Sequence, residues 1–300
     1  MEFKEIIDLK YKGIATRYDI NYWYYNAIES CKVSSFLFEN EIDNVISFMA
    51  SNKSNSLIID TCGNYYQVDF SNFQYLPFVK ELGLDSCYGK NVEYIYSLTD
   101  LEVLWLGDYF GEKIDLSRFK KLKKLVLFGN SSNVYGYENL KDLHTLVIHK
   151  YNYDNLKKLC CLEKLVALEL VQPKCTSLEE IESLKELKCL TIYNASKLET
   201  LSGIENNKNL QYVLLHNCKK IQRLNYLENN KELSFIDILN CGTIDSLNFL
   251  NRLCKLDDVS FVDTNIVDGD VSPLIGIRIH NYSNKRNFNY KCISGIDIKK

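Results

Sequence analysis

The chain carries eleven cysteines and four histidines, which are residue types suited to nucleophilic catalysis or metal binding. Cys189 and His216 could act as nucleophile and base only if neighbouring strands brought their side chains into contact. His149, His216 and His280 lie several repeats apart, too far to share a metal ion. Zinc-protease, phosphate-loop, dinucleotide-binding and nucleophile-elbow motifs are all absent from the sequence. The sequence therefore predicts no enzyme, no cofactor and no metal site.

The elements that position these residues follow a repeated spacing of apolar side chains, clearest in Leu122-x-x-Leu125-x-Leu127-x-x-Asn130. The same frame returns at steps of 21 to 23 residues, at Val79, Leu101, Leu143, Leu165, Leu187, Leu210, Leu233 and Leu256. Chance clustering of apolar residues would not keep so steady a period. The spacing therefore predicts stacked structural repeats.

Each frame predicts one short strand followed by a turn. Two apolar residues alternate with variable ones, as in a strand with one buried face. An Asn or Cys then follows, which can hydrogen-bond backbone groups or fill a small buried space. The cysteines in this position are expected to be buried and unreactive: Cys62, Cys87, Cys218 and Cys241. Apolar residues at every third position beyond it predict 3₁₀-like turns, and short α-helices are expected in 156–165 and 178–187.

The period and the three-residue spacing together resemble the SDS22-like, or internalin-like, class of leucine-rich repeat proteins, over roughly residues 54–282. The resemblance implies an α/β leucine-rich repeat solenoid. In such a solenoid a curved parallel β-sheet forms the concave face, and 3₁₀, short helical or irregular segments form the convex side. Because proteins of this class are mostly protein-binding scaffolds, the resemblance also implies a non-catalytic, protein-binding role.

The chain divides into three predicted parts. Residues 1–53 are expected to form an aromatic-rich N-terminal cap, with Tyr22-Trp23-Tyr24-Tyr25 at its centre and an amphipathic helix over Glu41–Ala50. Residues 54–282 form the solenoid of about ten to eleven repeats, and residues 283–300 form a C-terminal cap or tail. The last frame, Leu274-x-x-Ile277-x-Ile279, begins only 18 residues after Leu256. Alternatively, the aromatic segment is itself a binding patch.

Composition narrows the choice of partner and compartment. The net charge of -3 and pI near 5.9 argue against nucleic acid, which needs a basic surface. No secretory signal and no apolar run long enough to cross a membrane are present. The cysteines are odd in number and do not have the close, regular spacing of a secreted disulfide scaffold. We therefore expect a cytoplasmic protein with no membrane partner.

The variable positions of the strands predict three columns of side chains on the concave face. The first column is Glu81, Val103, Lys124, Thr145, Ala167, Cys189, Tyr212, Phe235 and Asp258. The second is Gly83, Trp105, Val126, Val147, Glu169, Thr191, Leu214, Asp237, Ser260 and Arg278. The third is Asp85, Gly107, Phe128, His149, Val171, Tyr193, His216, Leu239, Val262 and His280.

Two apolar islands stand out in these columns. The first island is Val103, Trp105, Val126, Phe128 and Val147, and the second is Tyr193, Tyr212, Leu214, Phe235 and Leu239. All of these except Val147 are predicted to bind a partner, together with the acidic residue Asp237. Exposed patches of this kind usually mark protein interfaces, with Trp and Tyr as typical hot spots. Acidic residues among them favour a protein partner with apolar side chains and some basic charge. Alternatively, a parallel sheet simply tolerates such strand-forming residues there.

The sequence leaves the role of that partner open. A general protein-binding scaffold is the favoured interpretation. A dedicated inhibitor or immunity protein that neutralises one toxin or enzyme is the alternative, and a secreted adhesin of the internalin type is a more distant one.

Overall fold

A computed structural model describes residues 31–61, 66–129 and 131–282 of the chain. It divides into two compact units, Met1–Val147 and Ile148–Lys300, which are described one at a time. The Tyr22–Tyr25 cluster, Cys62, Asn130 and the predicted tail 283–300 lie outside the described residues. Within the described residues, no helix has the length and apolar character needed to cross a membrane.

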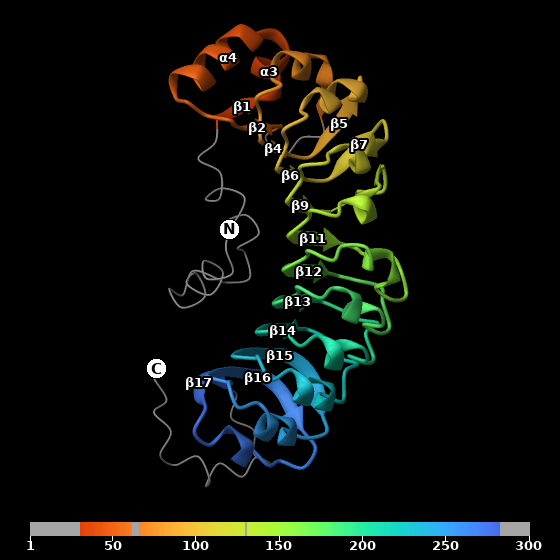
Figure 1. Ribbon diagram of the computed structural model, residues 1–300, viewed down its shortest axis with the longest axis vertical. Helices are drawn as coiled ribbons and strands as arrows, with labels where there is room; N and C mark the ends of the chain where they lie inside the picture. The colour runs from red at the N-terminus through yellow and green to blue at the C-terminus, as the bar shows by residue number, and fades with distance from the viewer. Residues whose placement is uncertain (1–30, 62–65, 130, 283–300) are drawn as a thin grey trace. The chain divides into compact units, whose positions relative to one another are not determined.

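The first unit begins with a strand–helix–helix–strand crossover, drawn in red and orange in Figure 1. Strand β1 (Cys31–Ser34) leads into α3 (Ser35–Asn40) and α4 (Ile42–Ser51), and β2 (Ser56–Asp60) pairs with β1 in parallel. The side chain of Ser34 caps α3 by accepting a hydrogen bond from the backbone of Leu37. Helix α4 confirms the predicted amphipathic helix, and Val45 and Met49 are buried on its inner face.

The main sheet of the first unit follows the predicted frames. Its strands lie in the order β1, β2, β4 (Glu81–Leu84), β6 (Val103–Leu106) and β9 (Lys124–Leu127), all parallel. Leu82, Leu104 and Leu125 are in register on neighbouring strands and are fully buried. The alternation along each strand therefore places one set of side chains in the core and the other set on the opposite face, as predicted. We call this opposite face, which carries the three predicted columns, the column face.

A second, smaller parallel sheet was not predicted. It consists of β3 (Tyr66–Asp69), β5 (Cys87–Lys90) and β7 (Tyr109–Gly111), while β8 (Ile114–Asp115) pairs with β10 (Val134–Tyr135). Gly89 of β5 allows the ring of Tyr109 to lie against the backbone, since a Cβ atom there would lie 2.6 Å from Tyr109 Oη. Tyr109 is buried and donates a hydrogen bond of 2.7 Å to the carbonyl of Glu112.

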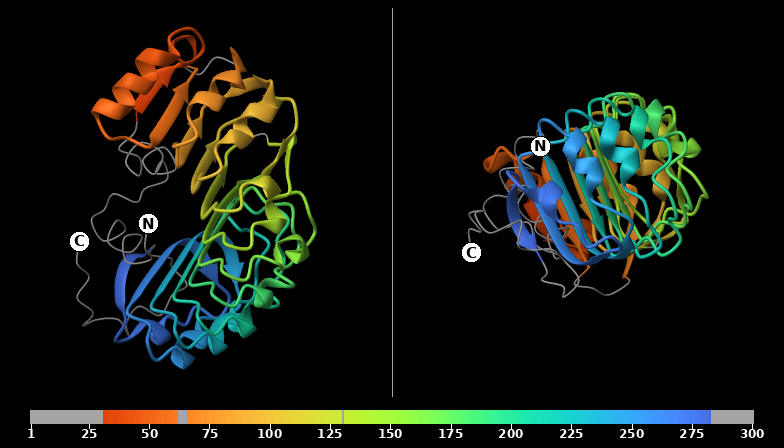
Figure 2. Two further views of the ribbon diagram at one scale, coloured as in Figure 1. Left: turned by 45° about the horizontal axis from the view of Figure 1, so that its top comes forward. Right: turned by 90° about the horizontal axis from the view of Figure 1, so that it is seen from below.

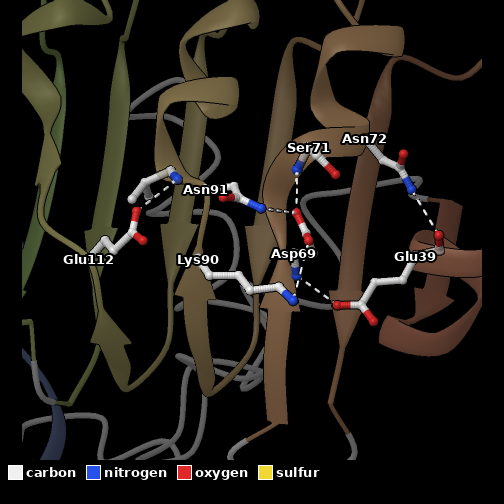
Figure 3. A network of polar contacts seen from close by, with 8 residues as sticks. Glu39, Asp69, Ser71, Asn72, Lys90, Asn91 and Glu112 are labelled. Atoms are coloured by element: carbon white, nitrogen blue, oxygen red, sulfur yellow. Dashed lines mark hydrogen bonds and ion pairs between the residues drawn. The ribbon is translucent and has the colours of Figure 1, made fainter.

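A polar network at the end of the small sheet joins α3 to the repeats (Figure 3). Glu39 Oε1 accepts a 2.6 Å hydrogen bond from the backbone of Asp69, whose carboxylate caps the next 3₁₀ turn through the backbone of Ser71. Asn91 Nδ2 donates to Asp69 Oδ1 at 2.9 Å, and Lys90 Nζ lies 3.3 Å from Asp69 Oδ2. Burial alone would raise the pKa of Asp69, but these contacts outweigh it and lower the pKa to about 2.

The second unit continues the same arrangement. Strand β11 (Thr145–His149) spans the boundary between the units. The strands of the second unit follow in the order β12 (Ala167–Val171), β13 (Cys189–Tyr193), β14 (Tyr212–His216), β15 (Phe235–Ile244), β16 (Asp258–Ile266) and β17 (Arg278–Tyr282). They are parallel, and Figure 2 shows the strands side by side with short helical turns along one side of them.

The arms between strands are built from 3₁₀ turns, as the three-residue spacing predicts. They are η1 (Phe70–Tyr75), η2 (Val92–Ser97), η3 (Leu116–Arg118), η4 (Tyr137–Asn139), η5 (Lys157–Leu159), η6 (Ile181–Ser183), η7 (Ile204–Asn206), η8 (Asn225–Asn229), η9 (Asn248–Arg252) and η10 (Ser272–Leu274). The α-helices predicted in 156–165 and 178–187 are wrong, because these segments contain only η5 and η6. A 3₁₀ turn places residues i and i+3 on one side, which suits the apolar residues at every third position.

The turn that follows each strand in the second unit uses two adjacent residues. Asn194, Asn217 and Asn240 adopt left-handed backbone conformations, and Asn217 Nδ2 donates to Asn194 Oδ1 at 2.7 Å. The next residue points into the core: Cys218 Sγ lies 3.7 Å from the carbonyl of Ile192 and donates to it. The prediction that the cysteines of this position are buried is confirmed for Cys87, Cys218 and Cys241.

The last predicted frame is displaced by two residues. Strand β17 pairs with β16 through Asp258 opposite Arg278 and Val259 opposite Ile279, and the register then shifts before Ser260. Arg278 therefore belongs to the first column and not to the second. His280 falls at the shift and does not continue the third column. The error arose because Leu274, which mimics the opening leucine of a strand frame, is instead buried in the 3₁₀ turn η10.

Candidate functional site

The strand register aligns the predicted columns on β4 to β9 in the first unit and on β12 to β16 in the second, but not on β17. In the first unit, the second column is completed by a residue that the prediction omitted: Ile58 of β2 lies opposite Gly83, which lies opposite Trp105, and Trp105 lies opposite Val126. The degenerate frame around Leu57 and Ile59 could have identified Ile58, because it lies between these two core residues.

The first apolar island is a packed cluster. Ile58, Trp105 and Val126 form its buried part, and Phe128 and Val147 pack against it. Gly83 carries no side chain, so Ile58 and Trp105 can meet across the intervening strand. The rings of Trp105 and Phe128 are stacked, with centroids 6.3 Å apart and planes at 22°. The structure thus brings together the predicted residues Trp105, Val126 and Phe128, with Val103 in the adjacent column.

The second island lies on strands β13, β14 and β15. Tyr212 is opposite Phe235, Leu214 is opposite Asp237, and His216 is opposite Leu239. Tyr193 is opposite His216, and their rings meet edge to face with centroids 5.8 Å apart. The five residues of this island and the acidic residue Asp237 therefore lie on one face of three neighbouring strands: Tyr193, Tyr212, Leu214, Phe235, Leu239 and Asp237.

The large side chains of both islands are less exposed than the sequence led us to expect. Trp105 is 7% exposed and Phe235 is 8% exposed, while Phe128, Tyr193 and Leu239 are partly exposed. Parallel strands lie only about 4.8 Å apart, so large side chains in one column cover one another. The partly exposed members are therefore the better positions for probing contact with a partner.

Asp237 is the predicted acidic member of the site. It is 4% exposed, and its Oδ2 accepts a 2.8 Å hydrogen bond from the hydroxyl of Tyr212. Burial raises the pKa of Tyr212 well above its usual value, and the neighbouring Asp237 raises it further. Tyr212 is therefore a neutral donor that holds Asp237 in place.

Glu169 was assigned to the second column but was not among the predicted binding residues. It lies opposite Thr191, whose hydroxyl donates to Glu169 Oε2 at 3.2 Å. Burial raises the pKa of Glu169 to about 7, and the hydrogen bond from Thr191 only partly opposes this. A carboxyl group with such a pKa, in register with the second island on the column face, is a candidate functional residue.

The pair considered for nucleophilic catalysis does not come together. Cys189 lies opposite Tyr212, and His216 is four residues further along the same strand as Tyr212. Four residues of strand span roughly 13 Å, which is far beyond hydrogen-bond distance. Within residues 31–61, 66–129 and 131–282, His, Cys, Asp and Glu side chains do not form a group of three that could hold a metal ion.

Comparisons with known proteins support the fold. No protein-family model matches the chain, and a search of curated proteins finds no match. Among solved structures, the chain is similar to a leucine-rich repeat protein of Leptospira interrogans, with TM-score 0.60, 17% identity, and coverage of 85% of this chain and 71% of that one. It is also similar to an internalin of Listeria monocytogenes, with TM-score 0.54, 14% identity, and coverage of 81% and 77%. The chain therefore has a leucine-rich repeat fold.

Proposed function

We propose that this chain is a non-catalytic scaffold that binds another protein through the column face of its repeats, which is the concave face of the leucine-rich repeat fold. The observation that carries the proposal is the gathering of aromatic and aliphatic side chains on this face. Each island combines a buried aromatic side chain with partly exposed neighbours. Hot spots of protein interfaces are enriched in such aromatic side chains, and the partly exposed members of each island can still be covered by a partner.

The acidic residues indicate the charge of the partner. Glu169, Asp237 and Asp258 lie on the column face of the second unit, in register with the residues of the second island or on the adjoining strands. Arg278 pairs with Asp258, with Nε 3.2 Å from Oδ2. A partner with apolar side chains and some basic charge would complement this face. We include a cytoplasmic location in the proposal, and cell fractionation with an antibody against the chain tests it.

The function can be tested with variants that change the column face and leave the core intact. Phe128→Ala and Tyr193→Ala remove partly exposed aromatic side chains, one from each island. Tyr135→Ala and Tyr153→Ala are matched controls, because these side chains are exposed and lie outside the columns. Each tagged full-length protein is incubated with lysate of the source organism, and the retained proteins are identified by mass spectrometry.

We expect one stoichiometric protein partner, bound by the wild-type chain and by both controls. Each column-face variant should weaken the binding of that partner by about 2 kcal/mol if the side chain is a hot spot. Thermal unfolding followed by circular dichroism checks that each variant is folded. Equal retention by all variants, or no retained protein at several salt concentrations, would contradict the proposal.

The same experiment addresses the alternative role. If the retained partner is toxic when expressed alone and harmless when co-expressed with this chain, the scaffold is a dedicated inhibitor or immunity protein. If it is not toxic, an adaptor role is favoured. An adhesin of the internalin type would instead place the chain and its partner at the cell surface.

A further inference from the structure

The middle row of the column face in the second unit carries carboxylates within a largely apolar surround. Glu169, Thr191, Leu214 and Asp237 lie opposite one another on β12, β13, β14 and β15. Three strand spacings separate the two carboxylates, which corresponds to about 14 Å. Ala167, Cys189, Tyr212 and Phe235 form the row on one side, and Val171, Tyr193, His216 and Leu239 form the row on the other.

The acidic side chains of this face differ in the groups that compensate their charge. Asp237 accepts a hydrogen bond from Tyr212, and Asp258 is paired with Arg278. Glu169 Oε2 accepts one hydrogen bond, from Thr191, while its Oε1 is buried and accepts none from the described residues. Among those residues, no lysine, arginine or histidine forms an ion pair with Glu169.

The charged side chains of the middle row, Glu169 and Asp237, are both acidic. The described column positions of β12 to β16 include no lysine and no arginine. On the next strand, β17, Arg278 lies opposite Asp258. A carboxylate that is shielded from water interacts strongly with a cation brought next to it. The raised pKa of Glu169 is consistent with a charge that lacks such a partner. Apolar neighbours such as Val171 and Tyr193 could cover the aliphatic part of a basic side chain.

We propose that Glu169, together with Thr191, is the subsite for a lysine or arginine side chain of the protein partner that docks on strands β12 to β15. The inference rests on the proposed function, because it names the group of the partner that this face recognises. Glu169 provides the charge, the hydroxyl of Thr191 orients its carboxylate, and the flanking apolar rows exclude water from the ion pair.

The experiment uses short random peptides displayed on phage as the probe. Peptides are selected against the full-length chain, and the best binders are synthesised and measured by titration calorimetry. Their basic residues are then replaced by norleucine for lysine or citrulline for arginine, which keep the length of the side chain and remove its charge. The protein variants are Glu169→Gln, the exposed control Glu186→Gln and the column-face variant Tyr193→Ala.

We expect the selected peptides to share a basic residue next to an aromatic or aliphatic one. Glu169→Gln should weaken their binding by about tenfold or more, as loss of a charge-assisted hydrogen bond in a shielded site predicts. Glu186→Gln should have no effect. Removing the charge of the peptide should have a similar effect on the wild-type chain and little further effect on Glu169→Gln, because the two groups act as a pair.

Two outcomes would overturn the inference, and they differ in what they say about the function. If the peptides lose affinity with Tyr193→Ala but lack basic residues or ignore Glu169→Gln, the column face still binds proteins and only the basic subsite is wrong. If the peptides bind Tyr193→Ala and Glu169→Gln as well as the wild-type chain, the column face itself is not the binding surface, and both proposals fail.

Discussion

The pKa of Glu169 makes a prediction at the scale of one residue. A glutamate has a pKa near 4.5 when unfolded, while burial raises that of Glu169 to about 7. Between these values the folded chain binds more protons than the unfolded chain, so the free energy of unfolding falls as the pH rises from 4.5 through 7. Glu169→Gln has no charge to bury, and above pH 7 it should be more stable than the wild-type chain by up to about 3 kcal/mol, because each unit of pKa shift corresponds to about 1.4 kcal/mol.

Urea unfolding above pH 7 and below pH 4.5 measures this difference. The stabilisation by Glu169→Gln should disappear below pH 4.5, because Glu169 of the wild-type chain is then protonated in both the folded and the unfolded state. Glu186→Gln, at an exposed position, should show no such pH dependence. A stability difference that is the same at both pH values would show that the charge of Glu169 is not its cause.

Asn230 illustrates a different kind of buried polar residue. Its Nδ2 donates 2.8 Å hydrogen bonds to the carbonyls of Ile204 and Asn207, which belong to the preceding arm. Asn230→Leu keeps the branched shape of the side chain but leaves these two carbonyls without their side-chain donor. We expect a loss of about 2 kcal/mol in the free energy of unfolding.

The neighbouring residue provides the control for that substitution. Asn229 is exposed in the same 3₁₀ turn, so Asn229→Leu should change stability by much less. Guanidinium unfolding of both variants tests the prediction, and equal losses would mean that the arm tolerates no leucine at either position.

At the scale of the element, the Asp69 network joins α3 to the first turns of the small sheet. Because the pKa of Asp69 is lowered to about 2 from an ordinary 3.8, its contacts stabilise the folded chain above pH 3.8 and are lost as the pH falls through 2. Asp69→Ala also removes the cap of η1, and we expect a loss of about 1 kcal/mol at neutral pH.

The pH dependence of the free energy of unfolding distinguishes the Asp69 contacts from an exposed ion pair. The stability difference between Asp69→Ala and the wild-type chain should shrink as the pH approaches 2. Asp100→Ala serves as the comparison, since its ion pair with Lys121 is exposed and should contribute little. If Asp69→Ala is no more destabilising than Asp100→Ala, the contacts of the Asp69 carboxylate with Ser71, Asn91 and Lys90 do not stabilise the folded chain.

The strands of the main sheet could be predicted from the sequence, whereas the small sheet and the register of β17 could not. The leucine frames determine which residues face the core, so the columns from β4 to β9 and from β12 to β16 are in the predicted register. The small sheet was missed because its strands are stabilised by tertiary contacts, such as Tyr109 packed over Gly89. The shift in β17 was missed because Leu274 has the right type and spacing for a strand but the structure uses it in a turn.

The sequence predicted which candidate residues share a face, but it did not predict how exposed they are. The columns identified the side chains that share a face, but their exposure depends on the neighbouring columns. Trp105, for example, is buried because Gly83 allows it to reach Ile58. Likewise, the sequence placed Glu169 on this face, whereas its raised pKa became apparent only from its burial.

At the scale of the whole molecule, the two islands lie in different units of the chain. If one partner contacts both, the losses of binding free energy in Phe128→Ala and Tyr193→Ala should add in the double variant, because the residues share no neighbours. Calorimetric titration of the purified partner into the single and double variants measures this sum. A double variant no weaker than the Tyr193→Ala variant alone would restrict the interface to the second unit.

The strict register of β12 to β15 has a consequence for how such a chain can change in length. Val213 and Ile236 occupy equivalent positions in consecutive strands, so each repeat meets the same kind of neighbour before and after it. Stability in such arrays depends mainly on contacts between adjacent repeats. A gene in which one whole repeat is duplicated or deleted would therefore encode a chain whose new junction resembles the old one. The binding surface could then grow or shrink by recombination, without any redesign of the interior.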